Sequence, residues 1–165
     1  PHPPIAAATA IPHASPPALP DPSPMPLSDD VKALINNAWN DGYPCLLTTA
    51  GARGPTVGPK GSLLVFDDGH LAYGERTQRG VLENLGGDKR VCVLYANFIA
   101  QREGKLDSGF LRFFGIAELH ESGPVHDAIF AKLSEREQTH KGADAGVGVL
   151  IKIDAPVNHR GESII

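Results

Sequence analysis

Cysteine, tryptophan and positive charge are all scarce in this sequence. Its 165 residues include two Cys and one Trp, and 15 Lys and Arg stand against 19 Asp and Glu, for a formal net charge of −4. Cys45 and Cys92 by themselves build neither a metal-ligand cluster nor a multi-bridge disulfide framework, so we interpret both as buried thiols. The acidic balance gives no general attraction for nucleic acid or for an anionic membrane. We therefore expect a cytoplasmic protein that binds neither.

Long apolar runs are also missing, and so is glycine from the first 27 residues, which hold ten of the 15 prolines. No segment reaches the ~20 apolar residues of a membrane span. The start lacks the basic residues and the apolar run of ~7 to 15 residues of a signal peptide. Residues 1–27 are predicted to form an extended or disordered leader, or alternatively an arm that packs on a partner subunit. Residues 28–165 are predicted to form one domain.

Short apolar runs, separated from one another by turn-forming residues, dominate the folded part. Ser28 precedes a helical pattern that ends at Asp41-Gly42, and Asp67-Asp68-Gly69 marks a hairpin turn. Two further helices are expected, at 78–85 and 124–133, and a polar loop at 101–108. Strands are expected at 44–49, from about 55, and at 62–66, 70–73, 90–95, 110–119 and 147–153. Strands joined mostly by hairpins predict a mostly β protein with an antiparallel sheet or small barrel.

Basic and hydroxyl residues cluster at the ends of two neighbouring predicted strands. A hairpin would bring together, beside a helix N-terminus, five of them: Lys60, Ser62, Arg76, Thr77 and Arg79. Cations, hydroxyls and backbone N–H groups together suit a phosphate monoester. The alternative is that the three cations are solvated surface residues. No run fits the nucleotide phosphate loop or the dinucleotide glycine fingerprint.

Several segments occur in an order that resembles a known family. They are GPTVGPKGS (54–62), DDGHLAYGERT (67–77), NL (84–85), RVCV (90–93) and RFFGIAE (112–118). Together they resemble the pyridoxamine 5'-phosphate oxidase-like family of FMN-binding split barrels, over roughly residues 28–153. The resemblance implies an antiparallel, Greek-key-like split barrel, a homodimer with FMN at its interface, and a flavin redox reaction.

The resemblance also implies a set of cofactor-binding residues. These are Gly58, Pro59, Lys60, Gly61, Ser62, Tyr73, Glu75, Arg76, Thr77, Arg79 and Arg112. Gly58 and Pro59 would let the backbone approach the edge of the flavin ring. Arg112 would place positive charge near the ring and make it easier to reduce, unless it forms a structural ion pair with a neighbouring strand.

The C-terminal segment departs from true pyridoxamine phosphate oxidases. It lacks their Trp-containing segment and their Arg-x-His motif, because it ends APVNHRGESII and the only Trp is Trp39. A small organic substrate other than vitamin B6 is therefore predicted. His159 and Arg160 are candidate substrate residues, with exposure to solvent as the alternative for His159.

No protein residue is predicted to act as the catalytic group, because a flavin carries out the difficult step itself. The predicted function is that of an FMN-dependent oxidoreductase, with NAD(P)H as a candidate electron donor. A flavin carrier without turnover and a haem-binding split-barrel relative are the alternatives, although the sequence has no clear axial ligand motif. No metal site is expected, since the histidines lack ligand spacing. The charged residues Lys132, Glu135, Arg136 and Glu137 are interpreted as a solvated helix end.

Overall fold

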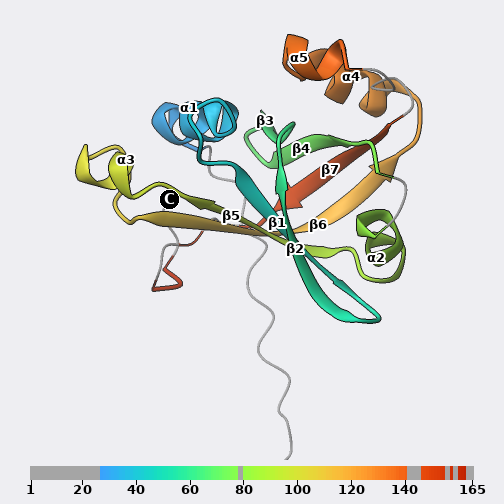
Figure 1. Cartoon of the computed structure of the whole chain (residues 1–165), viewed down its shortest axis with the longest axis horizontal. Coiled ribbons are helices and arrows are strands. Elements are labelled where there is room, and N and C mark those ends of the chain that lie inside the picture. The colour runs from blue at the N-terminus through green and yellow to red at the C-terminus, as the bar shows by residue number, and fades with distance from the viewer. Residues whose placement is uncertain (1–26, 78–79, 141–145, 155–156, 158–159, 163–165) are drawn as a thin grey trace, which may run out of the picture.

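The computed structural model describes residues 27–77, 80–140, 146–154, 157 and 160–162 (Figure 1). The predicted leader up to residue 26, Arg79 and His159 lie outside these residues. Leu27 is 5% exposed and packs in the main core, so the folded part includes the last residue of the predicted leader. None of the described helices is long and apolar enough to cross a membrane.

Seven strands form one antiparallel sheet in the order β2-β1-β5-β6-β7-β4-β3. Their bounds are β1 Cys45–Gly51, β2 Gly54–Lys60, β3 Leu64–Asp67, β4 His70–Glu75, β5 Arg90–Ala96, β6 Phe110–His120 and β7 Val147–Ile153. The two edge strands, β2 and β3, are consecutive in the chain, and only residues 61–63 join them. The sheet must therefore curl until its edges approach each other, which makes it a barrel-like sheet, as the sequence predicted.

Glycine and aspartate form the two hairpin turns. Gly54 begins β2 with φ +104°, a conformation that favours glycine, and pairs with Gly51 across the β1–β2 hairpin. In the β3–β4 turn, the Asp67 carboxylate accepts the backbone N–H of Gly69 at 2.9 Å and lies 2.7 Å from Nδ1 of His70. Both predicted hairpins are thus present, and they fix the pairing register of the strands that end near the predicted site.

Helices cover the ends and one outer face of the barrel (Figure 1). Their bounds are α1 Asp29–Asn37, α2 Val81–Gly87, α3 Phe98–Arg102, α4 Pro124–Lys132 and α5 Glu135–Gln138. Ser28 caps α1 as predicted, because its Oγ accepts the N–H of Val31 at 3.3 Å. Two short helices were not predicted. One of them, α3, begins just before the predicted polar loop at 101–108 and runs into it. The side chain of Asn97 caps this helix by accepting the N–H groups of Ile99 and Ala100.

The core has two parts on opposite faces of the β4 strand. Alternation along β4 sends Leu71 and Tyr73 into the barrel interior, where both are fully buried. Ala72 points the other way, into a smaller cluster with Ile129 and Leu133 beneath α4. This alternation decides which side chains at the end of β4 face the barrel mouth and which face α5.

Candidate functional site

An open groove of about 930 Å³ lies between the β1–β2 hairpin, the end of β4 and the start of α2. Small-molecule sites typically measure ~300 to 1,000 Å³, so a nucleotide-sized ligand fits. The hairpin contributes Leu47, residues 50–54, Thr56, Val57, Gly58 and Lys60, the β4 end contributes Glu75 and Thr77, and the α2 side contributes Gly80, Val81, Glu83, Asn84, Gly87 and Asp88. The groove therefore includes Gly58, Lys60, Glu75 and Thr77 from the predicted set.

The Asn84 side chain fixes α2 against the hairpin. Its Nδ2 donates to Oγ1 of Thr49 at 2.9 Å and to Oγ1 of Thr56 at 3.2 Å, and the two hydroxyls lie 3.1 Å apart. Gly51 leaves the room for this amide, because a Cβ at that position would lie 1.9 Å from Oδ1 of Asn84. Thr49 is 2% exposed, so this hydrogen-bond cluster reaches from a buried residue to Thr56, which is exposed at the groove. Sequence reasoning did not assign Asn84 a role, although it lies in a segment that carries the family resemblance.

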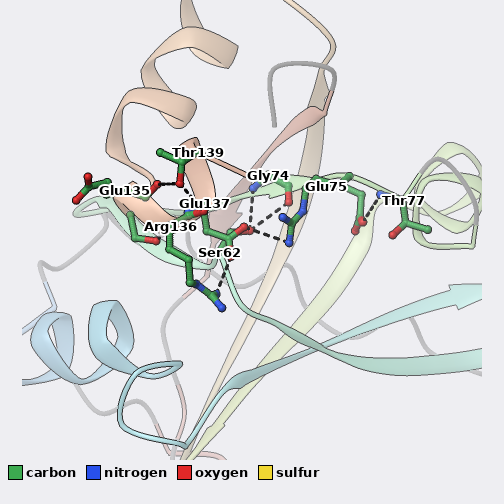
Figure 2. A network of polar contacts seen from close by, with 10 residues as sticks. Ser62, Gly74, Glu75, Thr77, Glu135, Arg136, Glu137 and Thr139 are labelled. Atoms are coloured by element: carbon green, nitrogen blue, oxygen red, sulfur yellow. Dashed lines mark hydrogen bonds and ion pairs between the residues drawn. The ribbon is translucent and has the colours of Figure 1, made fainter. Parts of the chain in front are cut away.

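Lys60 and Glu75 form a buried ion pair at the floor of the groove. Nζ of Lys60 contacts Oε2 of Glu75, and the two side chains are 14% and 6% exposed. The same Nζ lies 5.0 Å from the centre of the Tyr73 ring, within cation–π range. The other carboxylate oxygen of Glu75 accepts the backbone N–H of Thr77 at 3.1 Å (Figure 2). The predicted phosphate cation is thus present in the groove, and an internal carboxylate already holds it.

Ser62 and Gly61 lie next to Lys60 but face away from the groove. Oγ of Ser62 donates to the carbonyl oxygen of Gly74 at 3.1 Å and accepts the N–H of Gly74 at 3.2 Å, as Figure 2 shows. Gly61 packs on the Trp39 ring, since a Cβ there would lie 3.1 Å from a ring carbon. Both residues border a separate recess near α1. These contacts hold the β2–β3 connection against β4 and against the turn that follows α1.

The Arg76 side chain does not line the groove and pairs with a carboxylate of α5. Its guanidinium lies 3.2 Å from Oε2 of Glu137. The guanidinium of Arg136 donates to Oε1 of the same carboxylate at 2.7 Å, and Figure 2 shows these two residues. Glu137 is 5% exposed, and Arg136 also stacks over Trp39 at 5.0 Å. The interpretation of this charged run as a solvated helix end is therefore wrong at Glu137, because α5 folds back and buries that carboxylate between two arginines.

The other predicted cofactor residues divide between the groove, the core and the outer face. Gly58 lines the groove, and no atom lies within 4 Å of the place of its missing Cβ. Pro59 is exposed on β2. Tyr73 is fully buried in the barrel, and this burial raises the pKa of its hydroxyl. That hydroxyl has no hydrogen-bond partner within the described part of the chain. Arg112 lies on the outward-facing side of β6, with its guanidinium 5.6 Å from the Phe110 ring.

Neither cysteine has the environment of a nucleophile. Cys45 is buried, and desolvation raises the pKa of its thiol to about 12. Desolvation also raises the pKa of Cys92, which is half-buried on the outward face of β5. Both thiols stay protonated near neutral pH, so a catalytic thiolate is not supported. Among the described residues, no group of three or more His, Cys, Asp or Glu side chains is arranged to hold a metal ion.

Solved structures share this fold, while no protein-family model and no curated protein matches the sequence. HupZ of Group A Streptococcus is 25% identical with a TM-score of 0.63, over 83% of this chain and 97% of that one. A Lactobacillus delbrueckii protein, provisionally named a pyridoxamine 5'-phosphate oxidase, is 26% identical with a TM-score of 0.58, over 80% and 93%. An FMN-binding protein of Syntrophomonas wolfei has a TM-score of 0.53 at 14% identity, over 78% and 85%. The predicted resemblance and the split-barrel fold are confirmed.

Proposed function

We propose that this chain binds FMN in the groove beside Lys60 and acts as an FMN-dependent oxidoreductase on a small organic substrate. The observation that carries the proposal is a nucleotide-sized groove with a lysine ammonium at its floor, in the same β2–β4 region where the sequence resembles FMN-binding split barrels. A similar fold in a protein named as FMN-binding supports it. Among the described lining residues, the groove has no thiolate to act instead of a cofactor.

The residues present fit FMN in size and in donor chemistry. Lys60 supplies a cation for the phosphate, Thr77 lies beside it, and the open space over Gly58 lets a flat ring approach the backbone. Ser62 and Arg76 are not in this set, because both are bonded to the protein away from the groove. When bound, the flavin would supply the hydride or electron transfer, and the chain's own task is to hold and orient it.

We further propose that a second copy of the chain covers the outward face of β6. The strand register places Val57, Thr48, Cys92 and Phe114 in one row across four strands. Val57 is 66% exposed and Phe114 44%, and an apolar sheet face of this kind favours association. Size-exclusion chromatography with light scattering tests this proposal. We expect twice the chain mass for the natural protein and the mass of a single chain for Phe114→Asp.

The visible spectrum of the purified protein is the first test of cofactor binding. We expect flavin absorption bands, or uptake of added FMN with quenching of its fluorescence. A colourless protein that takes up neither FMN nor riboflavin would contradict the proposal.

Anaerobic reduction separates an enzyme from a carrier. We expect NADH or NADPH to bleach the bound flavin, and a small organic acceptor to restore its colour faster than buffer alone. If no donor reduces the flavin and no acceptor speeds its reoxidation, the chain is a flavin carrier and the enzyme proposal is wrong.

A further inference from the structure

Buried carboxylates hold both described cations that were predicted to bind phosphate. Glu75 contacts Lys60 in the groove, and Glu137 pairs with Arg76 outside it. The two carboxylate side chains are each 6% exposed. A phosphate site that is already neutralised by the protein differs from a simple basic pocket, because an incoming anion must compete with a resident one.

We propose that Glu75 is a specificity-determining residue, an internal counter-ion that competes with the ligand's phosphate for Lys60. This inference rests on the proposed function, since it concerns the same groove. In the free protein, Glu75 neutralises the ammonium of Lys60, whose side chain is 14% exposed. In the complex, the phosphate competes with the Glu75 carboxylate for that ammonium. Glu75 therefore sets how much binding energy Lys60 gives to a charged ligand.

The geometry keeps Glu75 at the groove when phosphate arrives. One carboxylate oxygen contacts Nζ of Lys60 and the other accepts the N–H of Thr77 at 3.1 Å. Both Glu75 and Thr77 line the groove. Because the backbone of Thr77 holds the carboxylate, it cannot retreat far from a phosphate bound to Lys60. Two anions would then share one cation at low solvent exposure, which weakens binding of the charged ligand.

The charges around the groove strengthen this argument. Its described lining holds two basic side chains, Arg53 and Lys60, and three carboxylates, Glu75, Glu83 and Asp88. Of the three, Glu75 is buried and contacts the lysine, whereas the other two lie on the α2 side. Removal of the Glu75 charge should therefore favour a phosphate-bearing ligand and leave a neutral one nearly unaffected. FMN and riboflavin are the matched pair of probes, because they differ by the phosphate.

The test compares Glu75→Gln with the natural protein by titration of FMN and riboflavin fluorescence. We expect Glu75→Gln to bind FMN at least tenfold more tightly, which corresponds to ~1.4 kcal/mol. Riboflavin affinity should change by less than about twofold, since riboflavin carries no charge to meet Lys60. Glu103→Gln is the matched control, because Glu103 pairs with Lys105 at 2.8 Å on the surface with side chains 52% and 55% exposed. It should change neither affinity.

Inorganic phosphate gives a second readout that needs no flavin. Glu75→Gln leaves a buried ammonium without its counter-ion, so the free variant should melt below the natural protein. Added phosphate should raise its melting temperature more than that of the natural protein, because the anion replaces the missing charge. Should the variant fail to fold, the neutral pair Lys60→Gln with Glu75→Gln is measured instead. It is expected to bind FMN and riboflavin with equal affinity.

Weaker or unchanged FMN binding in a folded Glu75→Gln variant would overturn the inference, and so would a neutral pair that still prefers FMN. These results differ from failure of the proposed function. If the natural protein binds neither flavin, the groove is not a flavin site, and the phosphate melting experiment alone decides the role of Glu75.

Discussion

Among the described residues, two Lys–carboxylate pairs join segments far apart in the sequence, and they differ in their exposure to water. Lys60–Glu75 lies at the barrel mouth with side chains 14% and 6% exposed. Lys32–Asp68 joins α1 to the β3–β4 turn at 2.7 Å, with side chains 29% and 59% exposed. Exposed pairs contribute little to stability, whereas removing one partner of a buried pair strands a charge. Of the two lysines, Lys60 is therefore the one that is mostly shielded from water, and it is also the one that lines the ligand-sized groove.

Lys60→Ala should give the largest effect, because it removes the cation of the buried pair. We expect the free energy of unfolding to fall by about 3 kcal/mol, since Glu75 is left buried without its main partner. FMN affinity should fall by ~30-fold or more, as expected when one member of a desolvated charge pair is truncated. Urea unfolding and fluorescence titration measure the two effects.

Lys32→Ala is the matched control for this comparison. Asp68 remains 59% exposed in the natural pair, so its carboxylate is solvated when Lys32 is lost. FMN affinity should not change. If the Lys32 variant loses as much stability as the Lys60 variant, burial does not distinguish the two pairs.

The direction of side chains at the β4 end explains what sequence reasoning could and could not predict about the site. The hairpin between the two neighbouring strands was visible, and with it the convergence of the Lys60 segment on the β4 end. The sequence does not show which face of the sheet meets the groove. Because Glu75 faces the barrel interior, its neighbour Arg76 must face the other side, where α5 supplies Glu137. The guanidinium of Arg76 therefore lies against Glu137, and its predicted role in cofactor binding stays a prediction.

Apolar patterning explains the success and the gaps in the fold prediction. The predicted strands were found because turn residues separate short apolar runs, as at β1, and α1 was found through its cap and periodic apolar face. The helix α3 was missed because Phe98 and Ile99 are 60% and 44% exposed, so it has no buried stripe to detect. The helix α5 has four residues, but Ser134 followed three positions later by Glu137 is a capping-box signal that was overlooked.

Glu137→Gln tests the second buried carboxylate, which lies outside the groove. We expect a loss of about 2 kcal/mol in unfolding free energy, because two charge-assisted contacts become neutral ones. The loss should be smaller than for Lys60→Ala, since Arg76 and Arg136 are 37% and 55% exposed and regain water. Urea unfolding measures it. Tryptophan fluorescence should also change, because Arg136 stacks over Trp39. A loss equal to that of Lys60→Ala would contradict this ranking.

Asn84→Ala tests whether the neutral hydrogen-bond cluster at the groove wall contributes as much to stability as a charged pair does. We expect a loss of about 1 kcal/mol, because the Asn84 amide donates to two threonine hydroxyls and Thr49 is buried. The two hydroxyls can still bond to each other, so the loss should be below that of the charged variants. Thermal unfolding measures it, and Asn40→Ala, at an exposed position in the turn after α1, is the control. A loss as great as that of Lys60→Ala would show that charge is not the decisive feature of the groove region.

Asp88→Asn should have the smallest effect on stability. It tests a solvated ion pair, Asp88–Arg90, through the pH dependence of the melting temperature. The side-chain hydrogen bond from Arg90, followed by the Arg90 backbone N–H, lowers the pKa of Asp88 to about 2. Because the folded-state pKa lies below the ordinary value near 3.8, this contribution to stability is present above about pH 4 and is lost as the pH falls towards 2. Melting temperatures at pH 7 and at pH 2.5 measure it. The variant and the natural protein should differ slightly at pH 7, and the difference should shrink at pH 2.5, when protonation of Asp88 weakens the same contact in the natural protein. A large difference at pH 7 would mean that a solvated pair stabilises this fold as strongly as the buried pair at the groove.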